Sequence, residues 1–141
     1  MAVYVDTSVL VALCTREGKS AGVSRWYAAC TDDLVSAMWC VAEFASVLSI
    51  KQRTGQIDAA EAQTAWRQFE RLCANDLQLL PMEPATFHRA AVLTLDAASG
   101  LRAGDALHLA AALGAKAKSM ATLDDVLAKN AKRMKLKLVA F

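Results

Sequence analysis

The sequence predicts an α/β fold in which helices cover both faces of a parallel sheet. Short apolar runs alternate along the chain with segments whose apolar residues recur at helical spacing. The 141 residues contain no repeat, no low-complexity stretch and no linker. We therefore expect residues 1–141 to form one domain with a full hydrophobic core. Hydrophobic residues make up 55% of the chain and aromatic residues only 6%, so Ala, Leu and Val build that core.

The elements follow from apolar spacing and from capping residues. The N-terminal run ends at Asp6 and turns directly into a helix, and Ser20 and Ser36 are expected to cap the next two helices. Asp58 and Glu61 form a capping box, and Gly55 is placed to end the helix before it. Strands are expected at residues 2–5, 34–35, 77–80, 120–121 and 136–140, and the later helices at 39–50, 58–73, 83–98, 105–116 and 124–134.

Several classes of protein are excluded by composition. Charges interrupt every apolar run before it reaches the length of a membrane span, and the first positive side chain, Arg16, comes too late for a signal peptide. The dispersed cysteines read as small buried thiols of a reducing compartment, which predicts a cytoplasmic protein. Together with two distant histidines they do not make a zinc site (Cys14, Cys30, Cys40, Cys73, His88, His108).

Charge is distributed unevenly along the chain. Residues 116–137 hold seven basic and two acidic residues, whereas residues 1–115 hold nine basic and twelve acidic ones. A basic segment on an acidic body fits contact with a polyanion. A solvated helix face with favourable charges at its C-terminal end explains the same pattern, and the sequence leaves both interpretations open.

Four acids occupy positions where a ligating carboxylate is expected. Asp6 ends the first strand, Glu43 lies inside an apolar helix, Asp105 opens a later helix, and Asp124 follows the strand near residue 120. Each has a structural alternative: Asp6 can cap its helix, and Asp105 can complement a helix dipole. Glu43 can reach the surface or pair with a base, but it is otherwise costly to bury.

The fourth acid is ambiguous because Asp124 and Asp125 are adjacent. Thr122 and Asp125 have the spacing of an N-cap and its third helical residue, which favours a structural role for Asp125 and chemistry for Asp124. Thr122 is then expected to cap the helix while facing the site.

If the four acids converge, they must protonate or bind a cation. Oxygen ligands without Cys or His favour Mg²⁺ or Mn²⁺, and such a site suits phosphodiester hydrolysis. The phosphate-binding motifs G-x-x-x-x-G-K-[ST] and G-x-G-x-x-G are absent. A second Asp two residues after Asp6 is also absent, which argues against a haloacid-dehalogenase type of phosphatase.

Four segments together resemble the PIN domain family. They are Val-Asp-Thr-Ser-Val-Leu at residues 5–10, Glu43 in the third helix, Arg-Ala-Gly-Asp-Ala-Leu-His-Leu-Ala-Ala at 102–111 and Ala-Thr-Leu-Asp at 121–124. In size, order and spacing they are similar to the VapC-type toxins of bacterial toxin–antitoxin pairs. The resemblance implies a three-layer α/β/α fold with a central parallel sheet in the order 3-2-1-4-5, and a Mg²⁺- or Mn²⁺-dependent endoribonuclease.

The resemblance also implies roles for individual residues. Asp6 and Asp105 are the expected metal ligands, and Glu43 and Asp124 complete the acidic pocket. Ser8 and Thr122 hold the carboxylates or a substrate phosphate. The implied partners are an RNA substrate, a small antitoxin that covers the site and a second copy of the chain.

Other residues near these motifs keep two interpretations. His108 is a packing residue of its helix or a general base, and the first is favoured. Arg102 contacts RNA phosphate or pairs with an acid. The tryptophans lie on apolar stripes and are assigned to the core or to a dimer interface rather than to base stacking (Trp26, Trp39, Trp66).

Two further functions compete with the nuclease. A non-catalytic PIN-like module would bind RNA or protein without cleavage. A receiver-like signalling domain would need an acidic pair near the first strand and an Asp after a later strand, but the third strand candidate ends in Leu80-Pro81.

Overall fold

The computed structural model describes all 141 residues and contains one parallel sheet of five strands. The strand order is β3-β2-β1-β4-β5, so the predicted α/β class and strand order are confirmed. The strands are β1 (Ala2–Val5), β2 (Asp33–Ala37), β3 (Leu77–Leu80), β4 (Ser119–Ala121) and β5 (Lys137–Leu138).

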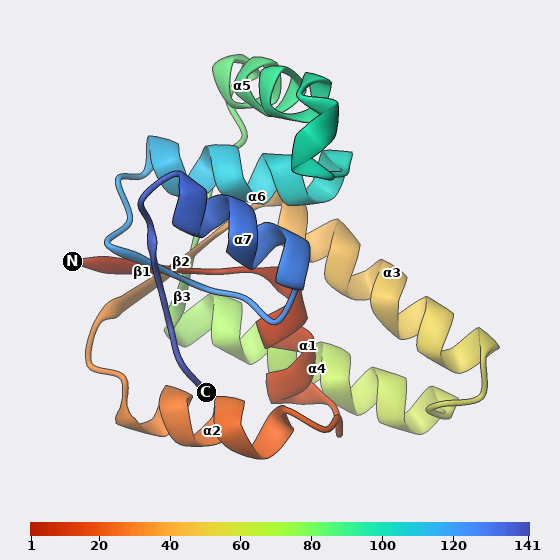
Figure 1. Cartoon of the computed structure of the whole chain (residues 1–141). Coiled ribbons are helices and arrows are strands. Elements are labelled where there is room, and N and C mark those ends of the chain that lie inside the picture. The colour runs from red at the N-terminus through yellow and green to blue at the C-terminus, as the bar shows by residue number, and fades with distance from the viewer.

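Helices connect all successive strands and cover the sheet on both faces (Figure 1). They are α1 (Thr7–Cys14), α2 (Ser20–Ala29), α3 (Trp39–Arg53), α4 (Ala59–Asn75), α5 (Pro84–Leu95), the 3₁₀ turn η1 (Ala97–Ser99), α6 (Ala103–Gly114) and α7 (Asp125–Arg133). None of these helices combines the length and hydrophobicity that a membrane span requires.

Two hydrophobic cores lie on opposite faces of the sheet because strand side chains alternate between the faces. Tyr4 belongs to the core under α6 and α7, and α5 packs on the outside of α6. Val3 and Val5 belong to the core shared with α1, α3 and α4. The three layers α/β/α follow from this alternation (Figure 1).

The predicted helix caps at Ser20 and Ser36 are wrong. Ser36 lies fully buried inside β2, and α3 begins only after Met38. Ser20 is the first residue of α2 rather than its cap, and its hydroxyl instead bridges the backbone of Thr15 and Glu17. A buried strand position in one case and the preceding loop in the other override the capping preference of serine.

The sheet order creates a topological switch point between its two central strands. From β1 the chain passes to β2 and β3 on one side, and then returns to β4 and β5 on the other. The carboxyl ends of β1 and β4 lie side by side, since the Asp6 N–H donates to the Ala121 carbonyl at 3.1 Å. Crevices outside such a switch point are where parallel α/β sheets bind ligands.

Candidate active site

Asp6 lies at the carboxyl end of the central strand and is 3% exposed. Its Oδ1 accepts hydrogen bonds from Ser8 Oγ at 2.6 Å and from the Val9 N–H at 3.2 Å, and its Oδ2 accepts from Thr122 Oγ1 at 2.5 Å. Asp6 is therefore the N-cap of α1 and also the centre of a polar cluster. The two interpretations of this residue do not exclude each other.

The hydrogen bonds of Asp6 leave capacity for one more partner. A carboxylate offers about four acceptor positions, and three are taken here. The remaining position is on Oδ2 and is available to a cation or a water. Burial raises the pKa of Asp6, while the charge of His108 and the donors Ser8 and Thr122 lower it. The net pKa lies above the ordinary value, so a bound cation would relieve the cost of the buried charge.

Asp124, rather than Thr122, caps α7. Asp124 Oδ1 accepts from the Leu127 N–H at 2.8 Å, and Asp125 is the first residue of the helix. The expected cap at Thr122 is wrong because its hydroxyl donates to Asp6 and accepts from the Asp124 N–H at 3.1 Å. Thr122 thus joins the residues after β4 to the end of β1. Asp124 stays close enough to Asp105 for its charge to raise the pKa of that residue.

Glu43 extends from α3 toward α1 and α6 and is fixed by side chains of these two helices. Its Oε1 accepts a hydrogen bond from Thr7 Oγ1 at 2.7 Å and lies in a short contact with His108 Nε2. Burial raises the pKa of Glu43, but the hydrogen bond and charge of His108, with Thr7 and Trp39, outweigh it and lower the pKa overall. Glu43 is therefore a paired carboxylate that stays ionised.

Gly104 makes room for the other oxygen of Glu43. A Cβ atom built at Gly104 would lie 2.7 Å from Glu43 Oε2 and 3.4 Å from Trp39 Nε1. The first turn of α6 can approach the carboxylate this closely only because residue 104 has no side chain. The absence of a side chain at this position therefore sets the distance between α3 and α6 at the site.

His108 lies beneath Glu43 and is 2% exposed. Its Nδ1 is 2.7 Å from the Tyr4 hydroxyl, and Thr7 Oγ1 is 3.2 Å from its Nε2. The burial agrees with a packing role on α6. Its direct contact with Glu43 was not predicted from the sequence.

Asp105 is the half-buried acid of the group and receives no hydrogen bond from the protein. Burial raises its pKa first, and the nearby charges of Asp124, Glu43 and Asp6 raise it further, while His108 lowers it. The structure thus brings Asp105 within electrostatic range of the other three predicted acids. Arg102, the exposed N-cap residue of α6, forms no ion pair with any of them.

The donor set fits a hard divalent cation. Asp6 keeps one acceptor position, Asp105 accepts no hydrogen bond from the protein, and no Cys belongs to this group. No group of three or more His, Cys, Asp or Glu side chains is arranged to hold an ion by itself. An ion held here would keep waters or substrate oxygens among its ligands, as Mg²⁺ commonly does.

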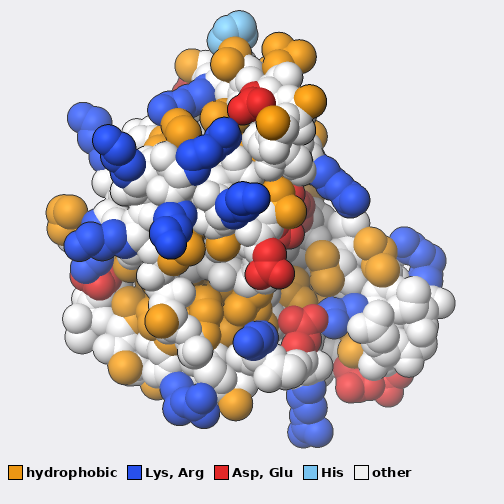
Figure 2. Space-filling model, in the orientation of Figure 1, with side chains coloured by type: hydrophobic (Ala, Val, Ile, Leu, Met, Phe, Trp, Pro, Cys, Tyr) orange, Lys and Arg blue, Asp and Glu red, His pale blue; other side chains and the backbone are white.

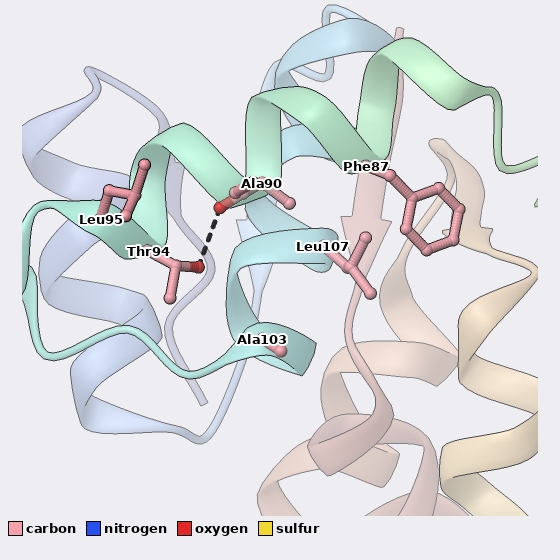
Figure 3. A pocket seen from close by; sticks show the side chains of 7 residues that line it. Phe87, Ala90, Thr94, Leu95, Ala103 and Leu107 are labelled. Carbon is pink, nitrogen blue, oxygen red and sulfur yellow. Dashed lines mark hydrogen bonds between the residues drawn. The ribbon is translucent and has the colours of Figure 1, made fainter.

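An apolar pocket between α5 and α6 is a separate feature (Figure 3). Phe87 and Leu107 extend toward it from the two helices, and Thr94 uses its hydroxyl to bind the Ala90 carbonyl at 2.8 Å. None of its lining residues is titratable, so this pocket cannot supply ligands for a cation.

Sequence reasoning missed four residues that shape the site. Tyr4 looked like an ordinary strand residue, although a buried Tyr hydroxyl needs a partner. Thr7 and Gly104 are sequence neighbours of predicted site acids, but no role was predicted for either residue. Trp39 was assigned to the core with the other tryptophans, and its indole lies next to Glu43. Trp66 packs on Phe44 and Phe69, as expected of a core residue, and Trp26 packs on Phe141.

Solved structures share this fold at low sequence identity. VapC20 of Mycobacterium tuberculosis, described as a sarcin–ricin loop cleaving toxin, superposes with a TM-score of 0.74 at 15% identity over 91% of this chain and 94% of that one. VapBC2 of Rickettsia felis bound to a promoter DNA fragment gives 0.66 at 15% identity, over 99% and 98%. FitAcB of Neisseria gonorrhoeae gives 0.69 at 16% identity, over 98% and 96%.

Comparison with curated proteins gave no match. The family model described as PIN domain matches residues 3–133. This range includes all four predicted acids, from Asp6 after β1 to Asp124 before α7. The chain belongs to the PIN domain family.

Proposed function

We propose that this chain is a Mg²⁺- or Mn²⁺-dependent endoribonuclease. The observation that carries the proposal is that Asp105 lies within electrostatic range of Asp6, Glu43 and Asp124 near the switch point of the sheet. The raised pKa of Asp105, caused by burial and then by its acidic neighbours, supports a site that gains from a cation. Residues 1–141 would form one PIN domain that carries this single site.

The side chains divide into ligands and supports. Asp6 and Asp105 would hold the ion, and Asp124 and Glu43 would complete the pocket and orient an attacking water. Ser8 and Thr122 keep Asp6 in place through the hydrogen bonds described above. The bound cation would polarise a phosphodiester oxygen and lower the pKa of water. Arg102, exposed at the start of α6, would contact RNA phosphate.

The argument for a toxin role comes from the solved structures with the same fold and not from the site itself. VapC20 is described as a toxin, and the name VapBC2 denotes a pair of proteins. We propose that this chain is likewise the toxin of a type II pair, neutralised in the cytoplasm by a small antitoxin. The exposed apolar side chains of α5, Phe87, Val92 and Leu95, support a protein partner such as a second copy.

The test is RNA cleavage by the purified, antitoxin-free protein. Total cellular RNA is incubated with Mn²⁺ or with EDTA, beside an Asp105→Asn variant whose folding is checked by thermal unfolding. Discrete fragments that require both the metal and Asp105 are expected. Equal cleavage by the Asp105→Asn variant would contradict the assignment.

A non-catalytic RNA- or protein-binding module is the second candidate. This candidate is favoured by the finding that no three His, Cys, Asp or Glu side chains are arranged to hold a metal ion by themselves. The same experiment separates the two functions. Tight RNA binding without cleavage in either metal, from a folded protein, would support the module.

A further inference from the structure

Three basic side chains share the exposed face of α7. Lys129, Lys132 and Arg133 are spaced i, i+3 and i+4, so they lie next to one another on the helix surface. All three are exposed, and Lys and Arg side chains gather over this part of the molecule in Figure 2. They belong to the basic segment for which the sequence left two interpretations open.

These side chains line a polar pocket between η1 and α7. The pocket has a volume of about 360 Å³, and Ser99 and Asn130 line it beside the three basic residues. Asn130 is buried, and its Nδ2 donates to the Ser99 carbonyl at 2.9 Å and to the Val126 carbonyl at 2.8 Å. These bonds tie η1 to α7, so the pocket has a fixed floor rather than being a gap between flexible segments.

Asn130 also orients the charged rim. Its Oδ1 accepts from Arg133 Nη2 at 2.9 Å, and Arg133 Nη1 lies 3.3 Å from Asp96 Oδ2. Arg133 and Asp96 are both half-exposed, so this ion pair is screened by water and costs little to exchange. A phosphate group could therefore replace the Asp96 carboxylate on Arg133.

The pocket, called here the α7–η1 pocket, is linked to the acidic site by helix α7. Asp124 caps the first turn of α7 at the acidic site, and Arg133 ends the same helix. The Gly100 turn after η1 lies against Val126, since a Cβ at Gly100 would be 3.7 Å from Val126 Cγ1. At 1.5 Å per residue, Lys129 and Arg133 lie roughly 7 to 13 Å along the helix from Asp124.

RNA that binds next to a cluster of acids needs a positively charged surface beside that cluster. The four carboxylates repel RNA phosphates, and one divalent cation offsets only part of that charge. At the axial distance given above, the pocket is within reach of an RNA strand whose cleaved phosphate is held at the acidic site. We propose that the α7–η1 pocket binds a phosphate of the substrate RNA close to the cleaved bond.

This inference rests on the proposed ribonuclease function, and RNA binding can be measured without cleavage. The probe is a fluorescent single-stranded RNA of about 12 nucleotides, a length that spans one such binding site. Fluorescence anisotropy is measured over a range of salt concentrations in the Asp105→Asn background. The test variant is Lys129→Gln with Lys132→Gln, because Gln keeps the helix propensity and removes two charges.

A matched control removes two charges from the same basic segment. Lys116 precedes β4 and Lys137 begins β5, and neither side chain lines the α7–η1 pocket. Lys116→Gln with Lys137→Gln is expected to change RNA affinity less than about twofold. The test variant is expected to bind about tenfold more weakly, with the salt slope reduced by about 1.4. Thermal unfolding confirms that both variants fold.

The possible results distinguish the failure of the proposed phosphate-binding pocket from the failure of the proposed nuclease function. Equal losses in the test and control variants, or no loss in either, would overturn the pocket and leave the function untouched. A selective loss of binding in a protein that never cleaves RNA would keep the pocket and overturn the nuclease. In the cleaving protein, the test variant should raise KM for RNAs extended past the pocket while kcat stays within about twofold.

Discussion

The Tyr4 hydroxyl lies 2.7 Å from Nδ1 of His108 and 3.1 Å from the Ala37 N–H. The hydroxyl thus joins the β2 backbone to one side of the imidazole ring. The other ring nitrogen, Nε2, contacts Glu43 Oε1. A buried Tyr in the central strand thereby determines how a histidine on α6 holds a carboxylate on α3.

Replacing Tyr4 with Phe should destabilise the protein by about 1–3 kcal/mol. The change leaves the Ala37 N–H and His108 Nδ1 without partners in the core, and it removes the contact that fixes the ring. Chemical denaturation measures the effect. Tyr27→Phe is the control, since that hydroxyl contacts Asp76 at an exposed position. An equal loss in the two variants would contradict the special role of the Tyr4 hydroxyl.

Gly104→Ala should impair the site with little loss of folding stability. The new Cβ would lie 2.7 Å from Glu43 Oε2, so the carboxylate must leave its position against Thr7 and His108. We expect RNA cleavage to fall by about tenfold or more, as misplacement of a catalytic group commonly does. Gly114→Ala is the control because a Cβ there meets nothing within 4 Å. Equal activity in the two variants would show that Glu43 does not need this position.

Thr122→Val should shift the acidic limb of the pH–rate profile to higher pH. The Thr122 hydroxyl donates to Asp6 and so favours its ionised form. Without this donor the pKa of Asp6 rises further, and protons compete with the cation up to a higher pH. The cleavage rate is measured against pH for this variant and for Thr64→Val, whose hydroxyl bonds only to its own helix. An unchanged acidic limb would disprove the coupling.

Asp105→Asn should raise the stability of the metal-free protein at neutral pH. The pKa of Asp105 is raised in the folded state, by burial first and then by its acidic neighbours. The folded state therefore binds this proton more tightly than the unfolded state does. That contribution is present below the unfolded pKa and is lost as pH rises through the folded pKa.

Asparagine cannot ionise, so the Asp105→Asn variant does not lose this stability as the pH rises. The unfolding temperature of the variant should therefore exceed that of the wild type at pH 7, and the difference should shrink on acidification. Added Mn²⁺ should stabilise the wild type and not the variant. A variant less stable than the wild type at pH 7, without metal, would contradict the electrostatic account.

The sequence predicted the sheet because its signals are local and agree with one another. Apolar runs of strand length alternate with helical periodicity, and the capping box of Asp58 and Glu61 forms as expected. The wrong caps at Ser20, Ser36 and Thr122 share one cause. Each of these hydroxyl side chains has another role in the fold. Ser20 bonds the backbone of the preceding segment, Ser36 lies inside a buried strand, and Thr122 donates to Asp6.

The four acids were predictable because unpaired carboxylates at strand ends and inside apolar helices are unusual. The residues that hold these acids in place could not be predicted from the sequence. The contact of Tyr4 with His108 joins residues 104 positions apart, and the contact of Thr7 with Glu43 spans 36 positions. No local pattern encodes such pairs. The need for glycine at position 104 likewise appears only when α3 and α6 are placed together.

The central claim is that Asp6 and Asp105 bind a divalent cation with which the protein cleaves RNA. The most direct measurement is the initial rate of RNA cleavage as a function of Mn²⁺ concentration, for the wild type, Asp6→Asn and Asp105→Asn. We expect saturation in the wild type and no metal-dependent cleavage in either folded variant. A variant that keeps the wild-type rate and Mn²⁺ dependence would contradict the claim.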